Sequence, residues 1–195
     1  KGMMQMKKAL CLILSFLVMT SALVFAQAAV TETPTTILNF DTTNNFVVEP
    51  AFNSTIKVET TVKTQGAGSM RFGFNKPLGQ DANVGGMFYY NSPSALNLSS
   101  YDKFAVDIYT PQSMEGKSGI FQINFCNANQ SDGINYNFDI SNAVAGWNTV
   151  YIDKDAFAAQ VNGASLSSVR RFRFTWFNND QITREFFLVD NFRGV

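Results

Sequence analysis

Apolar and polar residues alternate in short runs along most of the chain beyond residue 35, and Gly, Asn, Ser and Pro separate the runs. This period of two is typical of strands with one buried face, because successive side chains of a strand point to opposite sides of the sheet. The pattern predicts an all-β sandwich. The expected strands are Thr36–Asp41, Phe46–Val48, Ile56–Thr60, Ser69–Asn75, Gly86–Tyr90, Lys103–Tyr109, Gly119–Asn127, Asn135–Ile140, Asn148–Ile152, Val169–Phe177 and Glu185–Phe192.

Three of these strands separate their two faces most clearly. In the strand that begins at Val169, Phe172, Phe174 and Trp176 share one face, and the arginines between them share the other. The strands at 103–109 and 119–127 follow the same rule. If the three strands are neighbours, one sheet carries on its outer face Asp107, Tyr109, Gln122, Asn124, Arg171 and Arg173.

The N-terminal segment has the three parts of a secretory signal peptide in their usual order. Lys7 and Lys8 precede an apolar run over residues 10–25, and Ala26-Gln27-Ala28 offers small residues for cleavage. The apolar run is shorter than the about 20 residues that a transmembrane helix needs. We therefore expect residues 1–28 to be an N-terminal extension with a bacterial-type signal peptide. Residues 29–195 would then form a single secreted domain without a membrane anchor.

Composition narrows the function classes. The chain has 15 basic and 15 acidic residues, and cleavage after Ala28 would remove only basic ones, leaving a weakly acidic domain. Nucleic-acid binding is not expected, since phosphates call for a basic patch. There is no histidine, and Cys126 would be the one cysteine after cleavage, which argues against thiol catalysis and against an intrachain disulfide.

The polar groups of the predicted outer face suit a neutral sugar. Amide, carboxylate and guanidinium groups form directed hydrogen bonds with hydroxyls, and aromatic rings stack on the C–H faces of sugar rings. Tyr109, with either Tyr89 or Tyr90 from another strand, is the candidate stacking platform. The opposing interpretation is an ordinary solvated sheet face, on which charged pairs contribute little. Trp147 and Trp176 are expected in the core.

Four segments, taken in order, resemble landmarks of jelly-roll carbohydrate-binding modules of the galactose-binding-like superfamily, including family 11. They are Gln65-Gly66-Ala67-Gly68-Ser69-Met70-Arg71-Phe72, the segment from Leu98 to Tyr109, Gly146-Trp147-Asn148-Thr149-Val150, and Val189-Asp190-Asn191-Phe192. The resemblance covers nearly all of the chain from Ile37 to Arg193. It implies a jelly-roll β-sandwich of two antiparallel sheets.

The resemblance also implies a function and a metal ion. Such modules bind polysaccharide without cleaving it, with β-glucan or xylan the expected class, and they often accompany a glycoside hydrolase. A structural Ca²⁺ is implied at the carboxylates of Asp41 and Asp190, with backbone carbonyls of residues 63–66 as further oxygen donors.

Two other functions stay open at this point. A small polysaccharide hydrolase or lyase would need two carboxylates that flank the scissile bond. Asp102 with Asp107, or Asp153 with Asp155, are the nearest pairs in the sequence, but Asp102 falls in a turn and Asp153 follows a strand in the manner of a helix cap. A purely structural sandwich domain of a surface protein would have the same core without a binding face.

Overall fold

The computed structural model describes residues 33–49, 54–75, 84–127, 133–157, 165–177 and 184–195. The predicted signal peptide lies outside the described residues. These residues contain eleven strands and short 3-10 turns, and no α-helix. The strands are β1 (Thr35–Leu38), β2 (Phe46–Val48), β3 (Ser54–Glu59), β4 (Ser69–Asn75), β5 (Val84–Leu96), β6 (Lys103–Thr110), β7 (Ile120–Cys126), β8 (Gly133–Asp139), β9 (Gly146–Asp153), β10 (Val169–Phe177) and β11 (Arg184–Gly194). The 3-10 turns are η2 (Gln112–Met114), η3 (Ile140–Asn142), η4 (Lys154–Phe157) and η5 (Leu166–Ser168).

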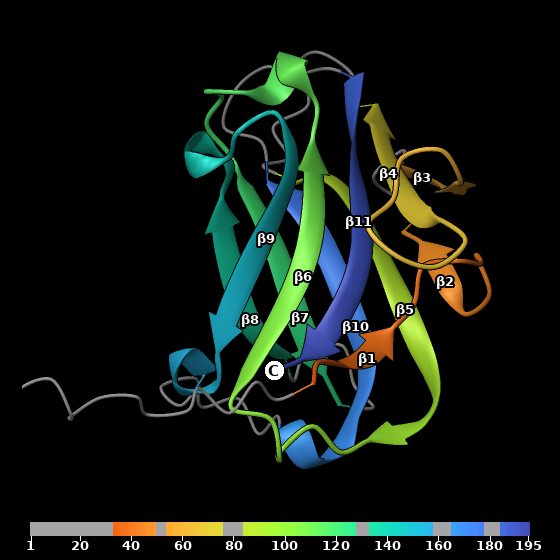
Figure 1. The fold of residues 1–195 in the computed structure, drawn as a ribbon, viewed down its shortest axis with the longest axis vertical. Helices are drawn as coiled ribbons and strands as arrows, with labels where there is room; N and C mark the ends of the chain where they lie inside the picture. The colour runs from red at the N-terminus through yellow and green to blue at the C-terminus, as the bar shows by residue number, and fades with distance from the viewer. Residues whose placement is uncertain (1–32, 50–53, 76–83, 128–132, 158–164, 178–183) are drawn as a thin grey trace, which may run out of the picture. The chain divides into compact units, whose positions relative to one another are not determined.

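The strands form two antiparallel sheets that pack face to face (Figure 1). The six-stranded sheet has the order β3-β4-β11-β6-β9, and β1 pairs with β11. The five-stranded sheet has the order β2-β5-β10-β7-β8. Neighbours in a sheet are mostly distant in sequence, as in a jelly roll. The predicted sandwich of two antiparallel sheets is confirmed.

The core between the sheets consists largely of phenylalanine. Phe88 on β5 stacks on Phe174 of β10 with ring centroids 4.7 Å apart, and it meets Phe72 of the opposite sheet at the same distance. Trp176, also inaccessible to solvent, packs against Phe187 of β11. Each such side chain contributes about 1.5–3 kcal/mol through burial. The period of two in the sequence therefore corresponds to one aromatic layer shared by both sheets.

Strand β5 continues well beyond the predicted end at Tyr90. Its register with β10 shifts between the pairs Asn91–Arg171 and Leu96–Val169, so β5 has extra residues there. Pro93 falls in this stretch, where its missing N–H breaks no ladder hydrogen bond. Asn, Ser and Pro end strands in most sequences, which is why the pattern alone stops too early.

No helix among the described residues has the length and apolarity that a membrane crossing requires.

Candidate functional site

The outer face of the five-stranded sheet carries three rows of side chains in register across the strands. The middle row runs Val47, Tyr89, Arg173, Asn124 and Asn135 from β2 to β8. The second row is Met87, Thr175, Gln122 and Asn137. The third is Asn91, Arg171, Cys126 and Gly133. We call these three rows the amide face.

Hydrogen bonds between strands hold the polar groups of the amide face in place. Arg173 Nε donates to Asn124 Oδ1 over 3.2 Å, and Gln122 Nε2 donates to Asn137 Oδ1 over 2.9 Å. Arg171 Nε donates to Asn91 Oδ1 over 2.8 Å. Groups fixed in this way by a rigid sheet lose little conformational entropy when a ligand binds.

Arg171 also covers Tyr89. Its guanidinium carbon lies 4.5 Å from the centre of the Tyr89 ring, within cation–π distance. Tyr89 is half-buried on the amide face, so it is the aromatic ring that the fold places beside the amides.

Three polar atoms of the amide face have no hydrogen-bond partner among the described residues. They are Asn124 Nδ2, Thr175 Oγ1 and one terminal nitrogen of Arg171. Asn124 has 0% of its surface exposed and Thr175 has 1%. An unpartnered buried polar group costs about 1–3 kcal/mol. Neighbouring side chains cover these atoms, so a ligand meets them only where those side chains move, and it first meets more accessible groups such as Gln122 and Asn137.

Asp107 and Tyr109 do not belong to this face, so the prediction that all six residues share one sheet is wrong. Both lie on β6, which pairs with β11 and β9 in the six-stranded sheet. Alternation predicted correctly that they point away from the core, but it carries no information on which strands become neighbours. Gln122, Asn124, Arg171 and Arg173 do lie together, as predicted.

Asp107 is instead the centre of a hydrogen-bonded network within the six-stranded sheet. It is 5% exposed and forms an ion pair with Arg193, with Arg193 Nη1 to Asp107 Oδ2 at 3.2 Å. Hydroxyls of Thr64 and Thr149 and the Asn191 amide also donate to its carboxylate, at 2.8–3.0 Å. With its oxygens engaged in this way, Asp107 connects the strands β6, β9 and β11 to the loop before β4.

The predicted tyrosines separate as well. Tyr90 lies on the core side of β5, where its ring meets Phe46 at 5.0 Å. Tyr109 packs edge-on against Trp147 at 5.6 Å on the outer face of the six-stranded sheet, and both are half-buried. The prediction of Trp147 as a core residue is wrong, and that of Trp176 is confirmed. Of the three predicted tyrosines, Tyr89 alone shares the amide face.

Neither a family model nor a curated protein matches the sequence. Solved structures match the fold. The family 11 carbohydrate-binding module from Clostridium thermocellum, in complex with a β-1,3-1,4-mixed-linked tetrasaccharide, aligns with a TM-score of 0.57 and 15% identity over 83% of this chain and 95% of that chain. A carbohydrate-binding module specific for non-crystalline cellulose aligns with a TM-score of 0.56 and 13% identity over 84% and 96%. The chain has the fold of these carbohydrate-binding modules.

The same fold also matches part of a larger enzyme. An exo-β-agarase aligns with a TM-score of 0.57 and 10% identity over 81% of this chain and 25% of that chain. At such low identity the likeness concerns the fold alone. The ligand of this chain must be inferred from its own residues.

Asp41 and Asp190 are the residues predicted to hold Ca²⁺. Their carboxylates form hydrogen bonds with the loop before β4. Asp41 Oδ1 accepts the N–H groups of Ala67 and Gly68 at 2.6 and 2.8 Å. Gly66, with φ of 62°, passes so close that a Cβ there would lie 2.5 Å from the same oxygen. Asp190 is 1% exposed and accepts the N–H groups of Thr64 and Gln65 at 2.7 and 3.0 Å.

In this arrangement the carboxylates of Asp41 and Asp190 accept backbone N–H groups of the loop. Ca²⁺ requires six to eight oxygen ligands, whereas both carboxylates here receive N–H donors. The described residues contain no group of three or more His, Cys, Asp or Glu side chains placed to share a metal ion. Calcium binding stays a prediction from the family resemblance.

Several residues of the amide face were not among the predicted site residues. They are Val47, Asn91, Asn135, Asn137 and Thr175. The alternation Asn135-Tyr136-Asn137-Phe138 was a usable signal for two of them, because Tyr136 and Phe138 pack against the core and the asparagines must then face outward. Val47 and Asn91 had no such signal, since their place in the rows depends on strand pairing.

Proposed function

We propose that this chain binds a neutral polysaccharide on the amide face and does not cleave it. The observation that carries the proposal is the middle row, in which the partly exposed side chains of Tyr89 and Arg173 lie in register beside the Asn124 amide. Sugar hydroxyls both donate and accept, so one ligand can satisfy an amide N–H and a threonine hydroxyl together.

β-Glucan is the first ligand class to test, and xylan the second. One structure of matching fold contains a β-1,3-1,4-mixed-linked tetrasaccharide, and another is specific for non-crystalline cellulose. The amide face supports a neutral ligand of this kind, because the polar groups of its three rows are amides, guanidiniums and hydroxyls, with no carboxylate among them.

Among the described residues, two carboxylates at the edges of this sheet are placed in a way that supports binding without catalysis. Glu49 directly follows β2, and Asp139 ends β8. These strands are the two edges of the sheet, about 19 Å apart at the usual strand spacing, and a glycosidase needs its two carboxyls within about 10 Å. The N–H and hydroxyl of Ser141 hydrogen-bond to Asp139 and lower its pKa, whereas a general acid requires a raised pKa.

Secretion and association with a glycoside hydrolase are parts of the same proposal. Secretion rests on the signal peptide pattern of residues 7–28, and N-terminal sequencing of the protein recovered from culture medium should begin at Ala29. A hydrolase partner is supported by the match of this fold to about a quarter of an exo-β-agarase.

The test is affinity electrophoresis of the purified protein in gels that contain β-glucan, xylan or mannan. Retardation by one of them, without new reducing ends after incubation, supports the proposal. Release of reducing ends would favour the hydrolase alternative. Unchanged mobility in all three gels would overturn the proposal in favour of a structural sandwich domain.

A further inference from the structure

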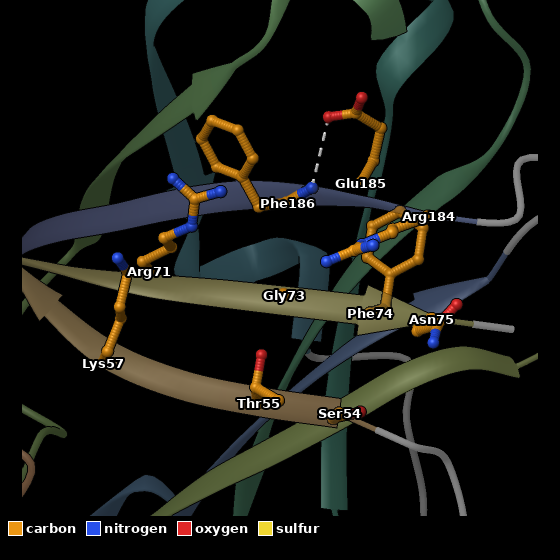
Figure 2. A pocket seen from close by; sticks show the side chains of 10 residues that line it. All are labelled: Ser54, Thr55, Lys57, Arg71, Gly73, Phe74, Asn75, Arg184, Glu185 and Phe186. Atoms are coloured by element: carbon orange, nitrogen blue, oxygen red, sulfur yellow. Dashed lines mark hydrogen bonds between the residues drawn. The ribbon is translucent and has the colours of Figure 1, made fainter.

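The outer face of the opposite, six-stranded sheet is hollowed at one end. The hollow has a volume of about 890 Å³ and is lined by residues of β3, β4 and β11 (Figure 2). Three of its lining residues are cations, namely Lys57, Arg71 and Arg184, and one, Glu185, is an anion whose carboxylate accepts the N–H of Phe186. None of them forms an ion pair with a described residue.

Two of these cations face each other directly. Lys57 on β3 is in register with Arg71 on β4, an arrangement of like charges that destabilises a sheet in the absence of a counter-charge. Glu59, two residues along β3, gives partial compensation. Hydrogen bonds from Thr61 lower the pKa of Glu59 most, and the charges of Lys57 and Arg71 lower it further by smaller amounts.

The Arg71 guanidinium lies over an aromatic ring. Its central carbon lies 3.6 Å from the centre of the Phe186 ring (Figure 2). Stacking restricts the guanidinium and leaves its edge N–H groups free for a planar carboxylate, which arginine binds with two parallel hydrogen bonds. An arginine positioned in this way at the wall of a hollow is well suited to bind an anion.

A glycine keeps the floor of the hollow open. Gly73 lies between Thr55 and Phe186 in register, and a Cβ there would be 2.6 Å from Thr55 Oγ1. On one side of it are Lys57 and Arg71. On the other side Arg184 is in register with Asn75, four residues from Arg71 along β4. The two cationic ends are thus about 13 Å apart along the backbone.

We propose that this hollow binds an acidic polysaccharide that carries carboxylates on successive rings. A single small anion would occupy one cationic end, whereas a chain of uronate rings reaches both across the open floor. A single-stranded nucleic acid fits less well, because successive bases each need a ring to stack on and Phe186 is the one aromatic lining residue outside the core. The site lies on the sheet opposite the amide face, so it is independent of the neutral ligand proposed there.

The test compares polygalacturonate with its methyl ester as ligands of the purified protein at low salt. We expect Arg71→Gln and Arg184→Gln each to raise the Kd for polygalacturonate about tenfold or more, as for loss of a charge-assisted hydrogen bond. Arg170→Gln is the matched control, because Arg170 is an exposed arginine outside the hollow and should leave the Kd within about twofold. Lys57→Gln replaces Arg71→Gln if the latter lowers the melting temperature.

Four results would overturn this proposal. They are no binding of polygalacturonate, equal binding of the methyl ester, an equal loss in Arg170→Gln, and equally tight binding of a single-stranded oligonucleotide. Tyr89→Ala separates the two sites. It should leave polygalacturonate binding unchanged, so failure at the hollow does not bear on the amide face.

Discussion

Arg173 and Asn124 face each other across β10 and β7, and the 3.2 Å hydrogen bond from Arg173 Nε turns the Asn124 amide so that Oδ1 is occupied and Nδ2 is not. The pair fixes a donor on the floor of the amide face. Beside it, the Thr175 hydroxyl also lacks a partner. A substitution that removes one of these two groups should therefore raise the stability of the protein and weaken ligand binding.

Thr175→Val should stabilise the protein and weaken binding. Valine has the same shape and removes a buried hydroxyl that no described residue satisfies. We expect a gain of about 1 kcal/mol, or a rise of about 2–4 °C in melting temperature, with a threefold to tenfold higher Kd for the neutral polysaccharide. Calorimetry and affinity electrophoresis measure the two effects. A lower melting temperature with unchanged binding would show that the hydroxyl has a structural partner.

Tyr89→Ala should raise the Kd for the neutral polysaccharide at least tenfold, about 1.4 kcal/mol, because Tyr89 is the aromatic ring of the middle row. Tyr151→Ala is the matched control, since Tyr151 is 58% exposed and belongs to the opposite sheet.

Tyr90→Ala has the reverse effect. It should lower the melting temperature by removing a ring that packs on Phe46, and it should leave the Kd of the folded fraction unchanged. If Tyr90→Ala weakens binding and Tyr89→Ala does not, the assignment of the two tyrosines to faces is wrong.

Asp107→Ala should destabilise the fold by about 3–5 kcal/mol, because it leaves the largely buried Arg193, with 15% of its side chain exposed, without its carboxylate. Asp107→Asn retains the shape and part of the hydrogen bonding, so its loss should be smaller. Urea unfolding gives the free energies. Binding by the folded protein should not change, and a Kd effect without a stability effect would return Asp107 to the binding residues.

Asp190→Ala should also destabilise the protein, since it removes the buried carboxylate that accepts the N–H groups of Thr64 and Gln65, at about 1.5–3 kcal/mol for each charge-assisted hydrogen bond. Melting temperatures measured with EDTA and with added CaCl₂ test the predicted binding of Ca²⁺. From the N–H donors around both carboxylates we expect one melting temperature in both conditions. A rise with CaCl₂ that Asp41→Ala and Asp190→Ala abolish would establish the ion and require the loop to turn its carbonyls toward it.

The sequence by itself determined the strands and the side to which their residues point. Alternation is a local steric property of an extended chain, so the core positions of Phe172, Phe174 and Trp176 follow from it. So does the outward position of Gln122, Asn124, Arg171 and Arg173. Even Tyr89 and Tyr90 could have been separated, because Tyr90 has the parity of the buried Phe88.

The tertiary structure alone decided which outward faces join. Strand pairing depends on long-range hydrogen bonds and packing, and alternation is the same whichever neighbour a strand takes. Strand β6 pairs with β11 and β9, so Asp107 became part of a buried network and Tyr109 a partner of Trp147. Strands β7 and β10 pair with each other and with β8 and β5, which brought Asn124, Arg173 and Tyr89 into one row.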